Sequence, residues 1–261
     1  LLQIANGFIL NDYRTLTGGF GNFQQLQNQF LFVNYTYGGY LSGLTFNTSF
    51  IYNREADYFS SRSFLNPDFS QSESILLNNR EMYSVNFGSD YYIKKLSNNL
   101  KTKLGYTNSR FQNFVNESGI RAIESRNIKV GIEVRSAFLG VFNYHIGTEW
   151  QYAEIEFGDK TTRTDNLSFL DLYFNLNKSF TVKVANDRYF FGNIDGNSDF
   201  YFTELSALYK PPKSAWDFEL KGHNLFNTNN LKNSNISDNA TSFTDFRLLP
   251  RYVMLKIGFR F

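Results

Sequence analysis

The chain has 261 residues, no cysteine and a formal net charge of +2. The absence of cysteine excludes a disulfide framework and any thiolate metal site, and the near-neutral charge argues against a nucleic-acid-binding surface. No segment approaches the roughly 18 consecutive apolar residues that a membrane-spanning helix needs, which excludes a helical membrane protein. Aromatic residues make up 18% of the chain, and a mean hydropathy of −0.38 still allows a β-barrel, because half of each barrel strand faces water.

Long segments that alternate apolar and polar residues fill the chain. Successive side chains of a strand point to opposite faces, so this alternation predicts two-faced strands. Connections that are alternately tight and long are typical of outer-membrane barrels. We predict strands at 7–15, 23–37, 40–58, 75–95, 99–116, 120–138, 141–156, 163–178, 180–190, 199–210, 214–226 and 246–261.

The connections between these strands differ in length. Tight turns are predicted at 38–39, 97–99, 139–140, 177–179 and 211–214, where turn-forming residues gather. The two longest links are 59–74, a candidate contact for a ligand or a partner, and 227–245, an Asn- and Ser-rich tract predicted to be a flexible solvent loop. The alternation of tight and long connections predicts both chain ends on the tight-turn side.

One predicted face is apolar and the other is charged. Ile132 and Leu172, for example, alternate with Glu133 and Asp171. A water-soluble sandwich of two sheets also alternates, but runs of about 15–20 residues are long for sandwich strands and favour a barrel. The charged residues predicted to line the lumen are Lys129, Glu133, Arg135, Glu149, Asp171, Glu219, Lys221, Lys256 and Arg260.

The sequence does not predict an enzyme. Both histidines, His145 and His223, fall on the charged face and neither lies in a nucleophile motif such as G-x-S-x-G, so each is expected to be hydrogen-bonded in the wall. The carboxylates Asp217 and Glu219 alternate with Lys221, which indicates salt bridging rather than acid–base catalysis.

No metal or cofactor site is predicted either. Asp195, Asn197 and Asp199 have the odd spacing of calcium-loop ligands, yet the distal bidentate Glu of that pattern is missing. We therefore expect a hairpin turn at 191–198, and no bound metal or cofactor.

The end of the chain carries the most specific pattern. Residues 246–261 read FRLLPRYVMLKIGFRF and are predicted to form one uninterrupted strand that ends in Phe. The segment WDFELKGHNLFNT at 216–228 lies one hairpin before it. Together, residues 216–261 resemble the last two strands of TonB-dependent outer-membrane receptors, with an Asn-, Tyr- and Phe-rich style similar to those of Bacteroidetes-type bacteria.

The resemblance implies an antiparallel transmembrane outer-membrane β-barrel of about 22 strands, an N-terminal plug, and energised uptake of a metal chelate, vitamin, glycan or peptide. About twelve strands and no plug are visible here, so we expect residues 1–261 to be the C-terminal portion of the barrel domain. Tyr252, Phe259 and Phe261 would carry the signal that the barrel-assembly machinery reads.

The expected partners follow from the same resemblance. They are outer-membrane lipid, the barrel-assembly machinery, a plug and TonB through an upstream part of the protein, and a surface lipoprotein, with no nucleic acid. The alternative is a small closed outer-membrane barrel with a structural or assembly role and no TonB coupling.

Overall fold

The computed structural model describes residues 7–39, 43–192, 198–238 and 240–259. The described chain is all-β apart from one 3-10 turn, η2 (Lys94–Leu96), and no helix in these ranges is long and apolar enough to cross a membrane. The strands are β1 (Phe8–Asp12), β2 (Thr15–Gly18), β3 (Asn28–Gly38), β4 (Leu44–Leu65), β5 (Ser70–Ile93), β6 (Asn98–Val115), β7 (Ile120–Ser136), β8 (Phe142–Phe157), β9 (Asp159–Asn177), β10 (Phe180–Phe191), β11 (Asp199–Tyr209), β12 (Trp216–His223), β13 (Asn230–Ile236), β14 (Thr241–Arg247) and β15 (Tyr252–Phe259). The predicted all-β class is confirmed.

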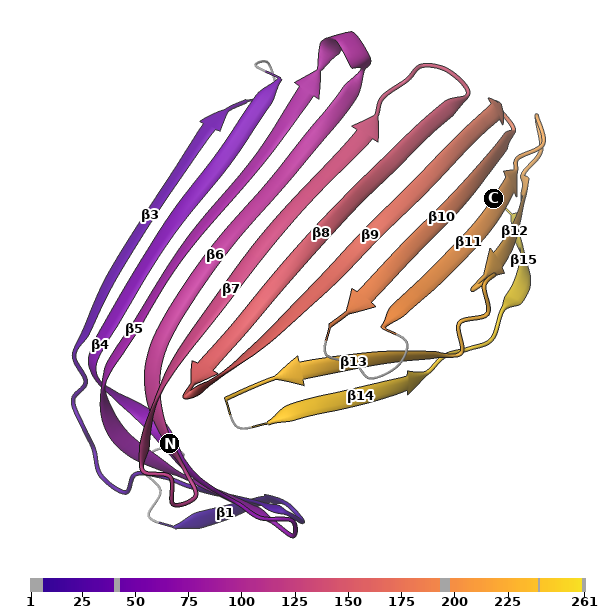
Figure 1. The fold of residues 1–261 in the computed structure, drawn as a ribbon. Helices are drawn as coiled ribbons and strands as arrows, with labels where there is room; N and C mark the ends of the chain where they lie inside the picture. Colours follow the sequence, from indigo (N-terminus) through magenta and orange to yellow (C-terminus); the bar gives the residue numbers. More distant parts are fainter. Residues whose placement is uncertain (1–6, 40–42, 193–197, 239, 260–261) are drawn as a thin grey trace.

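Thirteen of these strands form one curved, mainly antiparallel sheet (Figure 1). From β3 to β12 each strand pairs with the next in the chain, and β15 pairs with β12. The connections that follow β3, β5, β7, β9 and β11 lie at one end of the sheet, which is called the tight-turn end. The opposite end is called the long-link end. In the part of the chain that is described, β3 and β15 lie at opposite sides of the sheet and no pairing joins them (Figure 1).

Two strands extend further toward the long-link end than predicted. β4 and β5 contain 22 and 24 residues, so the predicted long link 59–74 is wrong. The Asn66 side chain accepts hydrogen bonds from the backbone N–H groups of Asp68 and Phe69 at 2.9 and 2.8 Å, which closes a tight connection. The polar residues on either side pair across the hairpin, as Arg62 does with Glu73 at 3.3 Å.

The predicted strand 7–15 is instead a small hairpin. β1 pairs with β2, and β2 runs parallel to the start of β5, with Thr15 opposite Ser70. A turn forms between them because Asp12 accepts a hydrogen bond from the backbone N–H of Arg14 at 2.8 Å. The first described residues therefore lie at the long-link end, and the expectation that both chain ends lie at the tight-turn end is wrong for this hairpin.

The C-terminal region also differs from its prediction. The link 227–245 is not a flexible loop, because it contains β13 and the start of β14, which pair with each other as a separate two-stranded sheet. The predicted strand 246–261 is interrupted between Arg247 and Tyr252, where Pro250 has no N–H to offer a neighbouring strand. The last two residues, Arg260 and Phe261, lie outside the described residues.

The pairing register gives the sheet two chemically different faces. The apolar face carries an apolar band that runs from the tight turns to a row of aromatic residues, namely Tyr52, Tyr83, Tyr106, Trp150 and Tyr152. Val130, Ile132 and Ile146 in this band are each 45% exposed, so no second sheet covers them in the described structure, unlike the core of a sandwich. The other face carries most of the ion pairs and is called the charged face.

Candidate functional site: the charged face

A ladder of ion pairs crosses β6, β7 and β8 on the charged face. Lys103 Nζ lies 2.9 Å from Glu133 Oε1 and 4.0 Å from Glu149 Oε2. Lys129 Nζ lies 2.7 Å from Glu149 Oε1, and His145 Nε2 lies 3.5 Å from Glu133 Oε2. The alternating charges of the sequence therefore become alternating charges across neighbouring strands.

Gly131 lies beneath this ladder. The register places it between Lys103 on β6 and Glu149 on β8. The long side chains of Lys103 and Glu149 reach each other over it. A Cβ at Gly131 would lie 3.5 Å from the Cβ of Lys103 and 3.6 Å from Oε2 of Glu149, which are ordinary contact distances, so the ladder leaves room for a methyl group there.

A second group of charges lies on β9 to β12. Lys183 pairs with Asp171 at 3.2 Å, and Lys221 pairs with Glu219 at 3.1 Å. Lys183, Lys221 and Glu219 also line a pocket of about 210 Å³.

His223 belongs to the same pocket. Its Nδ1 lies 2.9 Å from Glu204 Oε1, and its ring stacks on Tyr252 with centroids 4.8 Å apart. Like His145, it contacts a carboxylate on the charged face, as the sequence predicted.

The structure places the predicted lumen residues as follows. Eight of them lie on the charged face, and all but Arg135 and Lys256 are in ion pairs: Lys129, Glu133, Glu149, Asp171, Glu219 and Lys221. Arg135 lines a pocket near the tight turns, and Lys256 lies opposite Glu219 in the register of β12 and β15. The ninth, Arg260, is outside the described residues, and whether this face lines a lumen stays a prediction.

The β13–β14 hairpin packs against the charged face at the long-link end (Figure 1). The Arg121 guanidinium donates to Asp238 Oδ2 at 2.6 Å and to the Asp238 carbonyl at 3.2 Å. Arg163 donates to Asn233 Oδ1 at 2.9 Å, and the buried Ser234 donates to the carbonyl of Gly192 at 2.9 Å. These contacts fix the hairpin across the end of the sheet.

Sequence reasoning missed the role of the NLFN stretch. It forms a turn in which Asn224 and Asn227 have φ values of +51° and +56°, a region that Asn tolerates better than most residues. Asn224 Nδ2 donates to the carbonyls of Thr228 and Leu249 at 2.8 and 2.9 Å, and Asn227 Oδ1 accepts from the N–H of Arg251 at 3.0 Å. The two asparagines therefore tie β12 to the chain entering β15.

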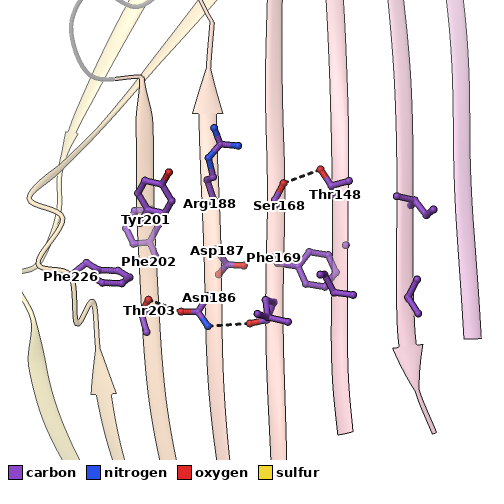
Figure 2. Close-up of a pocket in the computed structure, with 15 residues that line it drawn as sticks. Thr148, Ser168, Phe169, Asn186, Asp187, Arg188, Tyr201, Phe202, Thr203 and Phe226 are labelled. Carbon is purple, nitrogen blue, oxygen red and sulfur yellow. Dashed lines mark hydrogen bonds between the residues drawn. The ribbon is translucent and has the colours of Figure 1, made fainter. Parts of the chain in front are cut away.

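A groove of about 540 Å³ lies on the apolar face between β7 and β11 (Figure 2). Polar side chains cross it: Thr148 and Ser168 are hydrogen-bonded at 2.9 Å, and Thr203 donates to Asn186 at 2.8 Å. Phe226, from the NLFN turn, forms one side of it. The apolar face is thus less uniform here than the alternation alone predicted.

Comparisons with known proteins do not assign the chain to a family. No protein-family model matches the chain, and no curated protein matches it. Among solved structures, the siderophore receptor PirA from Pseudomonas aeruginosa is similar with a TM-score of 0.39 and 11% sequence identity over 82% of this chain. The match spans 42% of the length of that receptor's chain.

Proposed function

We propose that the chain forms part of the wall of an outer-membrane β-barrel of the TonB-dependent receptor type. The observation that carries this proposal is the two-faced sheet. Its apolar band extends over 44–52 in β4 and 142–152 in β8, which matches the roughly 9–11 residues that a strand needs to cross a bilayer. In this placement the tight turns are periplasmic and the long-link end is extracellular.

The open edges of the sheet support a larger barrel. Backbone N–H and C=O groups in the hydrocarbon must be paired, so β3 and β15 each need a neighbouring strand in the membrane. A small closed barrel would require β3 to pair with β15 directly, whereas they lie at opposite sides of the described sheet (Figure 1). We therefore place the chain in a barrel completed by further strands.

The charged face is proposed to be the lumen wall. Fixed, alternating charges suit contact with a polar plug and with a charged or polar ligand. The resemblance of residues 216–261 extends the proposal to energised uptake of a metal chelate, vitamin, glycan or peptide, with TonB acting through a plug. Tyr252, Phe259 and Phe261 are the proposed signal for the barrel-assembly machinery, and a surface lipoprotein is a candidate partner at the long-link end.

The proposed membrane placement is tested by charge substitutions on the two faces. Ile132→Arg and Leu172→Arg each put a guanidinium in the apolar band, and each should lower the free energy of unfolding by about 2–4 kcal/mol if the position is near the lipid midplane. Urea titration of the full-length protein folded into liposomes measures this effect.

Gln151→Arg is the matched control, because Gln151 is exposed on the charged face of β8. It should change stability by less than about 0.5 kcal/mol. Equal tolerance of all three substitutions would contradict the proposal that the apolar band faces lipid.

A further inference from the structure

A row of cations lies on the apolar face immediately beyond the aromatic row, toward the long-link end. Arg110 on β6 contacts Glu124 at 3.3 Å, and Arg126 on β7 contacts Glu124 and Glu154 at 2.8 and 2.9 Å. Lys160 on β9 contacts Glu154 at 2.8 Å. Arg110, Arg126 and Lys160, with the two glutamates between them, are called the cationic rim.

The cations of the rim are its outermost groups. The side chains of Arg110, Arg126 and Lys160 are 58%, 36% and 52% exposed, whereas those of Glu124 and Glu154 are 21% and 4% exposed. Three cations and two carboxylates leave one net positive charge. A molecule that approaches the rim therefore meets guanidinium and ammonium groups first, with the carboxylates behind them.

Three further charged groups lie beside the rim on this face. Arg54 on β4 is exposed, and Glu81 on β5 is partly buried and accepts a hydrogen bond from Tyr52 at 2.9 Å. Glu156 is an exposed carboxylate two residues beyond Glu154. With these three groups included the charges sum to zero, so the rim attracts an anion through the outward position of its cations and not through an excess of positive charge.

The carboxylates of the rim are held in their charged form. A hydrogen bond from Asn108, followed by those from Arg126 and Arg110, lowers the pKa of Glu124 to about 2. A hydrogen bond from Lys160 lowers the pKa of Glu154. Both glutamates therefore keep the cations in fixed positions at neutral pH.

The depth of the rim follows from strand geometry. Arg126 is two residues beyond Ile128, the last apolar residue of the band on β7, and a strand rises about 3.3 Å per residue. The Cα atom of Arg126 thus lies about 7 Å along the strand from the last apolar residue, which is about 5 Å above the hydrocarbon edge for a strand tilted by about 45°. That is the level at which lipid phosphates lie, next to the aromatic belt.

We propose that the cationic rim binds the phosphate groups of anionic membrane lipids on the long-link side of the bilayer. The inference rests on the proposed membrane placement. Arginine forks and an ammonium match phosphate oxygens in charge and geometry, and these cations lie where a lipid headgroup would be. A lipid is favoured over free phosphate because the rim borders the apolar band, so one molecule can contact both.

Residues 1–261 contain two tryptophans, which allow a direct test. Trp150 lies on β8 four residues before Glu154 on the same face, whereas Trp216 lies at the tight-turn end of the band. The full-length protein, with Trp216 and every tryptophan outside residues 1–261 replaced by Phe, is folded into phosphatidylcholine vesicles that contain phosphatidylglycerol, with bromine on the acyl chains of one lipid or the other. Quenching of Trp150 then reports which lipid occupies the neighbouring site.

Phosphatidylglycerol should be preferred at Trp150 by about fivefold, the effect of one exposed Lys or Arg near an anionic surface. Arg110→Gln with Lys160→Gln should abolish the preference, and Arg110→Lys with Lys160→Arg should retain it. The matched control removes two exposed lysines at the tight-turn end, Lys178→Gln with Lys210→Gln, and should leave the preference at Trp150 unchanged.

Three results would overturn the inference. They also distinguish a failure of lipid binding from a failure of the proposed membrane placement. Equal quenching of Trp150 by both lipids would contradict lipid selection while leaving the membrane placement intact. Loss of the preference in 10 mM inorganic phosphate would assign the rim to free phosphate. Absence of quenching by either lipid would contradict the membrane placement itself, and the rim with it.

Discussion

At the scale of single residues, a close contact over Gly147 shapes the charged face. The ring of Phe169 lies over Gly147 and meets the ring of His145 edge-on, with centroids 4.7 Å apart. A Cβ at Gly147 would lie 2.6 Å from Phe169 and 3.0 Å from Cγ of Glu133. The absence of a side chain at this position therefore lets an aromatic ring cover the strand backbone, which protects a glycine within a strand.

Gly147→Ala should consequently lower the free energy of unfolding by about 1–3 kcal/mol, the usual effect of overpacking. The matched control is Gly131→Ala on the neighbouring strand and the same face, where the nearest atom to a new Cβ is 3.5 Å away. That substitution should be neutral or stabilising, because alanine restricts the unfolded chain. Urea titration in liposomes compares the two, and an equal loss in both would contradict the close contact.

The ionisation of Glu124 makes the stability of the protein depend on pH in the acid range. Its folded-state pKa of about 2 lies below its ordinary value of 4.5, chiefly because Asn108 donates to it. A lowered pKa gives a stabilising contribution that is complete above pH 4.5 and is lost as the pH falls toward 2. The difference in stability between the wild type and Glu124→Gln should therefore shrink across that window.

Stability titrations of the two proteins at several pH values measure this difference. Asn108→Ala, which removes the largest cause of the shift, should raise the folded-state pKa of Glu124 and so narrow the window from its lower end. A difference that stays constant between pH 5 and pH 2 would contradict the hydrogen-bonded geometry of Glu124.

At the scale of elements, the β13–β14 hairpin depends on a few distant contacts. Arg121 and Asp238 have side chains that are only 11% and 19% exposed, so the pair is largely removed from water. Removing one partner of a buried pair leaves the other charge without compensation. The hairpin should therefore detach from the charged face when Asp238 is replaced.

Asp238→Ala should raise the rate of backbone hydrogen exchange in residues 230–247 by tenfold or more, which corresponds to about 1.4 kcal/mol of local stability. Exchange in the apolar band of β7 and β8 should not change. Asn235→Ala is the control, because Asn235 is exposed on the same hairpin. Exchange mass spectrometry that shows no difference between the two variants would contradict the anchoring role of Asp238.

The strands that sequence predicts best are those whose pattern is local. The segment 120–138 was predicted as a strand, and β7 spans Ile120–Ser136, because a two-residue period needs no information from elsewhere in the chain. The hairpin β13–β14 was missed because it has few apolar residues and its anchor, Arg121, is more than a hundred positions from Asp238. The break before Tyr252 was missed although Pro250 marks it, since the alternation continues on both sides.

On the charged face, too, the local pattern was predictable and the contacts between strands were not. Alternation predicted that Lys129, Glu133 and Glu149 share a face, and the register confirms it. Their partners were not predictable, because Lys103 meets Glu133 only if the turn between β6 and β7 has a given length. A pattern in one strand fixes a face, whereas the pairing of strands fixes the contacts.

At the scale of the whole molecule, one arrangement connects the fold with the proposed function. A single sheet presents an apolar band about as wide as a bilayer on one face and a network of ion pairs on the other. The cationic rim and the aromatic row border the band at the long-link end, and tight turns border it at the other. The proposed transport, lipid binding and barrel assembly all depend on which of the two faces touches hydrocarbon.

Both tryptophans of the chain lie on the apolar face, Trp150 at 45% and Trp216 at 47% exposure, so their fluorescence tests this orientation directly. The full-length protein, with every tryptophan outside residues 1–261 replaced by Phe, is folded into vesicles of brominated phosphatidylcholine, and the single-tryptophan variants Trp150→Phe and Trp216→Phe separate the two signals. If the apolar face touches lipid, brominated acyl chains should quench both tryptophans strongly and aqueous acrylamide should quench them weakly. Strong quenching by acrylamide with little effect of the brominated lipid would show that the apolar face does not touch the membrane.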